Sequence, residues 1–216
     1  MSEVITTYKL TDLDEPIPMD RDEFYDEQIE EFKKKGKPSR AVEIIQVLLF
    51  SHDKDVILQK RSISKRHNAG LIDKSLGGHV TFGNSPFFTV MVETLQELKV
   101  SSIVLPSNED FTKTYKLLKN HLDHTSIVQY VDSRTSNFKK MFGNEEILIA
   151  NKYHFYLGVY GGSVRPAEQE ASGILFSRFE NLQEDIKNHP ELFTYDLVFF
   201  LDKYEKKIKT FLANFK

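Results

Sequence analysis

The sequence contains no cysteine among its 216 residues. A disulfide, a thiolate nucleophile and a cysteine zinc site are therefore excluded. The chain also lacks an apolar run approaching the ~18 residues that a bilayer-spanning helix needs. Its first segment, MSEVITTYKLTDLDEP, is acidic and has no apolar stretch of the kind found in secretory signals. These absences predict a cytoplasmic protein with no membrane partner.

Charge of one sign is not in excess either. The net charge is −3, and the basic residues are scattered; the runs at 33–35 and 139–140 are short. We therefore expect no nucleic-acid partner. The chain is 40% hydrophobic and has 17 phenylalanines, which is ample material for a core. With no internal repeat and no linker rich in Pro, Gly or Ser, residues 1–216 are predicted to form a single domain.

The hydrophobic pattern predicts an alternation of strands and helices, and hence an α/β fold. Strands are predicted over 41–50, 56–62, 125–131, 153–162 and 171–179, and helices over 22–35, 180–189 and 195–215. Residues 1–40 are predicted to be a polar N-terminal extension carrying the first helix. The segment 101–150 is predicted to be an insertion, with a helix over 108–124 and a mobile polar loop over 133–146.

The most informative stretch is GGHVTFGNSPFFTVMVETLQELKV, residues 77–100. Ser85 and Pro86 predict a helix start, because serine can cap free amides and proline suits the first helical position. The helix carries one apolar stripe, of the kind that faces a core, made of Phe88, Met91, Leu95 and Leu98. Glu93 and Glu97 are four residues apart and share another face.

This order of a strand pair, two glycines, a glutamate helix and further strands resembles the Nudix superfamily. Its sequence box is G-x5-E-x7-R-E-U-x-E-E-x-G-U, where U is aliphatic. With the first box glycine at Gly78, the other positions hold Asn84, Val92, Glu93, Thr94, Gln96, Glu97, Lys99 and Val100. Two of the four acidic positions are kept, and the arginine and the second glycine are replaced.

The segments around the box strengthen the resemblance. LQKRSISKRHNAGLIDKSLGGHV (58–80) is similar to the subgroup related to isopentenyl diphosphate isomerase. RPAEQEASGILFSRFENL (165–182) is similar to a frequent downstream segment of the family, with Phe176 in place of a tryptophan. The resemblance implies an α/β/α sandwich around a central mixed β-sheet.

The resemblance also implies a hydrolase of small molecules that contain a nucleoside diphosphate, with Mg²⁺ or Mn²⁺ as cofactor. A divalent cation neutralises crowded phosphate charge, and carboxylates hold the cation. By resemblance, the metal ligands are the Gly77 carbonyl, Gln96 and Glu97, and Glu93 is a ligand or the catalytic base. Because the amide of Gln96 brings no charge, we expect Mg²⁺ to bind weakly without substrate, on the order of millimolar.

Further candidates lie on both sides of the predicted cleft. Arg61 and Lys65 are candidates for binding substrate phosphates, although Arg61 could equally close a strand-end salt bridge. Glu170 and Glu168 could add a carboxylate from the far side of the cleft, or they could be solvated loop acids. His79 follows the glycines, as in the isomerase subgroup, and could instead be a hydrogen-bonded structural histidine.

Two alternatives stand beside the hydrolase. One is a catalytically inactive Nudix-fold module that binds a nucleotide or a protein. The other is an isomerase of isopentenyl diphosphate, a family that relies on a cysteine and on histidines where this chain has Gly77, Ser39 and Glu43. We predict no isomerase activity. We also predict that the 101–150 insertion packs beside the cleft or builds a homodimer contact.

Overall fold

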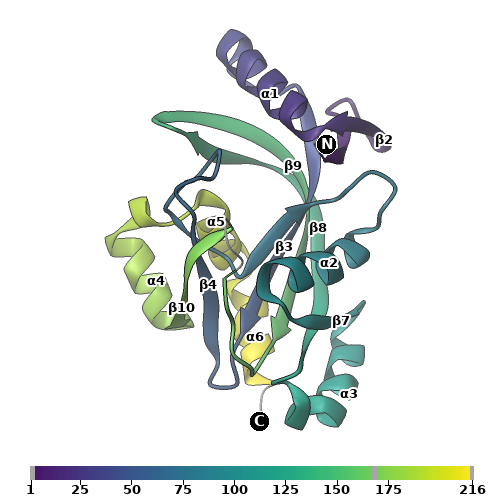
Figure 1. Ribbon diagram of the computed structural model, residues 1–216, viewed down its shortest axis with the longest axis vertical. Helices are drawn as coiled ribbons and strands as arrows, with labels where there is room; N and C mark the ends of the chain where they lie inside the picture. The colour runs from purple at the N-terminus through teal and green to yellow at the C-terminus, as the bar shows by residue number, and fades with distance from the viewer. Residues whose placement is uncertain (1–2, 167–169, 215–216) are drawn as a thin grey trace.

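The computed structural model describes residues 3–166 and 170–214 of the chain. A curled, mixed β-sheet forms its centre, and helices lie along its sides (Figure 1). The predicted α/β class with a central mixed sheet is confirmed. Among the described residues, no helix is both long enough and apolar enough to cross a bilayer.

Strand β3 (Arg40–Phe50) lies at the centre of the sheet, and every residue from Ala41 to Phe50 is buried. It pairs in parallel with β9 (Glu145–Val159). The main order is β10-β4-β3-β9-β8-β7. The other members of this path are β10 (Ala171–Arg178), β4 (Asp55–Arg61), β8 (Thr125–Phe142) and β7 (Ser101–Leu105).

Strand β3 changes its antiparallel partner along its length. Its last residues, Leu49 and Phe50, pair with β4, whereas residues 44–47 pair with β6 (Leu76–His79). Strand β4 continues instead beside β5 (Ile72–Asp73). Residues from both branches line the cavity described below. The division of the sheet therefore positions the candidate site.

The N-terminal extension contains more regular structure than predicted. Helix α1 (Arg21–Lys35) confirms the helix expected over 22–35, and it begins at Asp20, whose carboxylate accepts from two backbone amides of the first turn. Before it, β1 (Val4–Lys9) and β2 (Asp12–Asp20) form a hairpin that was not predicted. Strand β1 adds this hairpin to the sheet by pairing with β3.

The prediction of a mobile polar loop over 133–146 is wrong. This segment is the end of a long hairpin in which β8 and β9 pair from Ile127–Val159 to Phe142–Glu145, around a turn at Gly143 and Asn144. Phe138 is fully buried. The polar composition concealed the strands because the other face of the hairpin is exposed, so its alternate residues are polar. The strand predicted over 153–162 accordingly begins at Glu145.

Helix α2 (Pro86–Leu98) begins as predicted. The Ser85 hydroxyl accepts from the Phe88 amide, and the helix ends at Lys99, which has a φ of +59°. Its apolar stripe does not face the core: Phe88, Met91 and Leu95 are each about half exposed, and only Leu98 is buried. The buried face consists of Thr89, Val90, Thr94, Glu97 and Leu98. The helix therefore turns its glutamate face, rather than its apolar stripe, toward the sheet.

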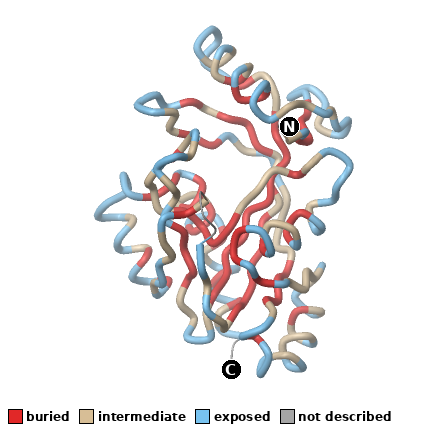
Figure 2. The backbone as a smooth tube through the Cα atoms, viewed as in Figure 1, coloured by how far each residue is buried: buried red, intermediate tan, exposed pale blue. Residues whose placement is uncertain are grey.

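The predicted terminal helix over 195–215 is two helices, α5 (Tyr195–Lys203) and α6 (Glu205–Ala213), and its last residue lies outside the described residues. Helices α3 (Asn108–Leu118) and α4 (Phe179–Asn188) occur close to the predicted positions, and short 3₁₀ turns cover Lys119–His121 and Pro190–Leu192. Phe155 of β9 stacks against both Phe200 and Tyr204, with ring centroids 4.8 and 4.6 Å away. Figure 2 shows the buried residues concentrated in the central strands.

Candidate active site

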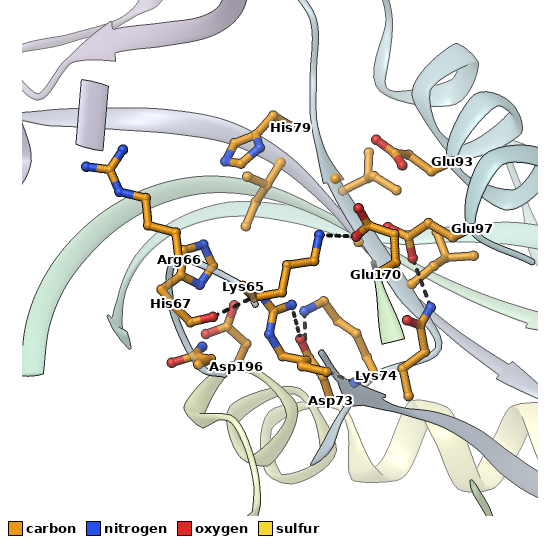
Figure 3. Close-up of a pocket in the computed structure, with 18 of the residues that line it drawn as sticks. Lys65, Arg66, His67, Asp73, Lys74, His79, Glu93, Glu97, Glu170 and Asp196 are labelled. Atoms are coloured by element: carbon orange, nitrogen blue, oxygen red, sulfur yellow. Dashed lines mark hydrogen bonds and ion pairs between the residues drawn. The ribbon is translucent and has the colours of Figure 1, made fainter. Parts of the chain in front are cut away.

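A cavity of about 870 Å³ opens between the two branches of the sheet. Its lining is strongly polar and contains both acids and bases (Figure 3). All of the predicted site residues lie in it: Arg61, Lys65, Gly77, Glu93, Gln96, Glu97 and Glu170. Glu168 lies outside the described residues. The structure therefore brings together residues from β4, β6, α2 and two loops, over more than a hundred positions of sequence.

Two glutamates of α2 form the acidic wall of the cavity. Glu97 is buried and accepts a hydrogen bond from Gln59 Nε2 at 2.9 Å. Burial raises the pKa of Glu97 to about 7, and the nearby Glu170 adds to this effect. Burial, followed by the charge of Glu97, raises the pKa of Glu93 to about 8. When both carboxylates are ionised they repel each other in a desolvated site, and a bound cation would offset that repulsion.

The paired glycines allow the helix to approach the turn closely. A Cβ atom at Gly78 would overlap the Glu93 carboxylate, and one at Gly77 would lie 2.6 Å from Lys74 Cε. Only glycine leaves room for both side chains. The Glu93 side chain of α2 therefore packs directly against the glycine turn.

The opposite wall is basic and is fixed by a buried ion-pair network. Asp73 lies 3.1 Å from Arg61 and 3.0 Å from Lys74, and it accepts from the Thr194 hydroxyl at 2.7 Å. Burial alone would raise the pKa of Asp73, but Lys74 and Arg61 outweigh it and hold the pKa well below its usual range. Arg61 thus makes the predicted strand-end salt bridge and also lines the cavity.

The loop cations are paired with acids across the cavity mouth. Lys65 forms an ion pair with Glu170, the residue expected to face the cleft from the far side. Arg66 pairs with Asp22 at 3.2 Å and with Asp26, both on α1. In Figure 3, Lys65 reaches across the pocket toward Glu170 and the two glutamates.

Gln96 is the weak member of the predicted ligand set. Its side chain is exposed at the edge of the cavity. Among the described residues there is no cluster of three or more His, Cys, Asp or Glu side chains with the spacing of a metal site. The carboxylates of Glu93 and Glu97 suit a divalent cation, but the cation would need further oxygen ligands from the amide of Gln96, from backbone carbonyls, from water or from a substrate.

His79 has the structural role given as its alternative. Its Nε2 lies 2.9 Å from the Tyr25 hydroxyl. Burial, with the nearby charge of Lys140, lowers the pKa of His79 to about 3, so the ring is neutral. A buried, neutral and hydrogen-bonded imidazole serves mainly to attach α1 to β6.

The sequence did not reveal a second group of cavity residues. They are Gln46, His67, Lys140 and Asp196. Lys140 was assigned to the polar loop, although its alternation with Phe138 was a usable strand signal. Asp196 interrupts the apolar helix start TYDLVFF, which was an available but weak signal. Lys140 places the β8–β9 hairpin beside the cleft, as predicted for part of the insertion.

No family model matches the sequence. An isopentenyl-diphosphate Δ-isomerase from Streptomyces coelicolor is 26% identical over 140 residues, which are 64% of this chain. The match spans 58% of the length of that curated relative.

Solved structures resemble the fold more extensively. The protein DR0079 from Deinococcus radiodurans has a TM-score of 0.54 at 16% identity, covering 75% of this chain and 82% of its own. A MutT protein from Methanosarcina mazei has a TM-score of 0.51 at 15% identity, covering 77% and 94%. A bifunctional NMN adenylyltransferase/ADP-ribose pyrophosphatase from Francisella tularensis has a TM-score of 0.50 at 11% identity, covering 87% of this chain and 46% of its own. The chain has the Nudix fold.

Proposed function

We propose that this chain, which has the Nudix fold, is a divalent-cation-dependent hydrolase of a small molecule containing a diphosphate. One observation carries the proposal: the partly buried Glu93 and the buried Glu97, one helical turn apart, face a polar cavity whose opposite wall holds Arg61 and Lys65. Carboxylates opposite cations suit a ligand with paired phosphates and a cation between them and the acids.

The acidic wall supplies the ligands for the cation. Glu97 would hold Mg²⁺ or Mn²⁺ together with the Gly77 carbonyl and the Gln96 amide oxygen, and Glu93 would be a further ligand or the catalytic base. The bound cation supplies charge neutralisation for the phosphate oxygens. Since the two glutamates alone are few ligands, substrate phosphates would complete the set, and occupancy would depend on substrate.

The basic wall supplies phosphate contacts. Arg61 is oriented by Asp73, so its guanidinium is held in place before a substrate arrives. Lys65 is paired with Glu170, and a phosphate would compete with that carboxylate for the ammonium group. Glu170 would then be free to contact the substrate, as the resemblance suggested.

Glu93 is the proposed base. Its carboxylate is desolvated and lies near Glu97, so once it is ionised its affinity for a proton is higher than that of an exposed glutamate. It can therefore accept the proton of an attacking water near neutral pH. Glu97, which is fixed by Gln59, is better placed to remain a ligand.

A substrate screen tests the proposal. Nucleoside diphosphate derivatives are incubated with Mg²⁺ or Mn²⁺, and the phosphomonoester products are measured as phosphate release by an added phosphatase, for wild type, Glu93→Gln and Glu97→Gln. Glu109→Gln, on the exposed side of α3, is the matched control. We expect release that requires the cation and falls by at least ~100-fold in both site variants but not in the control. Release that is indifferent to Glu93 and Glu97 would contradict the proposal, and nucleotide binding without any release would support the binding-module alternative.

A further inference from the structure

A second group of polar side chains, buried or partly buried, lies in the cavity, away from Glu93 and Glu97. We call it the recognition cluster, and it consists of Gln46, Arg61, His67, Lys140 and Asp196. Gln46 and Asp196 are each 3% exposed, and Lys140 is 5% exposed. Figure 3 shows His67 and Asp196 together on one side of the pocket and the two glutamates on the other, with Lys65 between them.

The recognition cluster is rich in atoms without partners. Among the described residues, four of its buried atoms make no hydrogen bond: Gln46 Oε1, Arg61 Nε, His67 Nδ1 and Asp196 Oδ1. Gln46 Nε2 reaches Asp196 Oδ2 only at 3.5 Å. Buried polar atoms are almost always paired, because leaving them unpaired costs their full desolvation energy. Four in one cavity therefore indicate a ligand that pairs with them.

Lys140 adds a buried positive charge: burial alone would lower its pKa, but Tyr25 and Asp196 outweigh burial and raise the pKa. Within the part of the chain that the structure describes, its ammonium group forms no hydrogen bond or ion pair, and the Tyr25 ring centroid is 5.9 Å away. A buried lysine is normally paired. Burial, followed by the charges of Lys140 and Arg61, holds the pKa of His67 well below its usual range, so His67 is neutral and does not supply a second charge.

The surrounding structure holds the recognition cluster rigidly. Asn68 fixes the His67 loop to β8 through two hydrogen bonds with Met141, at 2.9 and 2.8 Å. The start of α5 is fixed to β5, since the Thr194 amide donates to the Ile72 carbonyl at 2.9 Å and its hydroxyl bonds Asp73. The unpaired atoms are therefore held in place by bonded neighbours, which is how a preorganised binding site is built.

We propose that the recognition cluster binds a planar heterocycle whose edge carries N–H donors next to a carbonyl, the pattern of guanine. This rests on the proposed function, in which the diphosphate points to Glu93 and Glu97. Asp196 Oδ1 and Gln46 Oε1 accept from a ring N–H and an exocyclic amine, and Lys140 donates to the carbonyl oxygen. Adenine has no ring N–H donor on its Watson–Crick edge and no carbonyl, so it leaves Asp196 and Lys140 unpaired.

Nucleotide binding in EDTA tests this inference without turnover. GDP, IDP and ADP are titrated calorimetrically into wild type, Asp196→Asn, Lys140→Met and the control Asp202→Asn, which lies at the exposed end of α5. We expect GDP to bind at least ~10-fold more tightly than ADP, with IDP between them because it lacks the exocyclic amine. Asp196→Asn and Lys140→Met should each remove most of the preference for GDP and IDP over ADP, because both bases carry the ring N–H and the carbonyl that these side chains contact. Asp202→Asn should change nothing.

Equal affinities for the three nucleotides, no measurable binding, or a GDP preference that survives Asp196→Asn would overturn the inference. Its failure is separable from that of the proposed function. If only the inference fails, guanine and adenine substrates are hydrolysed at equal kcat/KM in a cation-dependent way, and Asp196→Asn has no effect on their ratio. If only the hydrolase proposal fails, the GDP preference persists in Glu93→Gln and no phosphate is released.

Discussion

Glu93 and Glu97 are retained in a place where carboxylates are costly. Both are largely removed from solvent, and the nearest cations, Lys65 and Lys74, only partly offset that burial. In the metal-free protein, the raised pKa values leave both carboxyl groups partly protonated near neutral pH. A group that is destabilising in the fold yet positioned by Gly78 and Gln59 is the usual sign of a ligand-binding residue.

Replacing Glu93 by Gln should therefore stabilise the metal-free protein at pH 8 and not at pH 5. The pKa of Glu93 in the folded protein, about 8, lies above the ordinary 4.5 of the unfolded chain. The free energy of unfolding of wild type is therefore highest below pH 4.5, where Glu93 is protonated in both states, and it falls as the pH rises toward 8. Glutamine does not ionise. The free energy of unfolding of the variant should exceed that of wild type by on the order of 2 kcal/mol at pH 8. Urea unfolding in EDTA measures this, and a difference that does not depend on pH would count against it.

Gln96→Glu should tighten Mn²⁺ binding about tenfold, because it adds a charged oxygen ligand at the cavity edge. Calorimetric titration with Mn²⁺ measures the change. Asn181→Glu is the matched control, since Asn181 is exposed on α4 and lies outside the cavity. Equal gains from the two substitutions would show a non-specific charge effect.

The acidic half of the site could be predicted from sequence, and the recognition cluster could not. Glu93 and Glu97 lie on one helix next to a glycine turn, so local spacing places them together. Gln46, Lys140 and Asp196 come from β3, β8 and α5, and only the topology of the sheet brings them into one cavity. Their chemistry also gave no signal, because a lone Lys or Asp is typical of an exposed surface.

At the scale of elements, helix α2 shows why a hydrophobic stripe does not always identify the buried face. Leu95 is 57% exposed and Leu98 is 1% exposed, although both belong to the predicted stripe. The orientation is set by the contacts of the glutamate face with the glycine turn and by Val90 in the core. Likewise, the polar face of the β8–β9 hairpin concealed two paired strands.

The orientation of α2 predicts different costs for the same substitution at two positions. Leu98→Ala should lower the free energy of unfolding by about 2–4 kcal/mol, because it leaves a cavity in the core. Leu95→Ala should lower it by less than ~0.5 kcal/mol, because that side chain is largely solvated. Chemical denaturation of both variants measures the difference. Similar losses would mean that the apolar stripe is buried in solution.

At the scale of the whole molecule, likeness to an isomerase over 140 residues does not by itself show that reaction. The residues that replace the isomerase groups have other roles here. Ser39 bonds Gln28 and Glu27, and Glu43 bonds His154 and the Tyr8 hydroxyl. Neither Ser39 nor Glu43 lines the cavity. The fold is shared, while the side chains that perform the chemistry differ.

We therefore predict that the protein does not exchange protons into isopentenyl diphosphate. The measurement is deuterium incorporation from heavy water in the presence of Mg²⁺, with heat-inactivated protein as the control. A rate above that control would show that another base replaces the missing cysteine, and the isomerase alternative would return.

Cation binding at the two glutamates is the most direct test of the hydrolase site, because it requires no knowledge of the substrate. Electron paramagnetic resonance measures free Mn²⁺ during a titration at pH 8 of wild type, Glu93→Gln, Glu97→Gln and the control Glu109→Gln. We predict one weak Mn²⁺ site in wild type, with a Kd on the order of millimolar, unchanged in the control and weakened at least ~10-fold in each site variant. Binding that is the same in all four proteins, or absent from wild type even with a diphosphate compound present, would contradict the account.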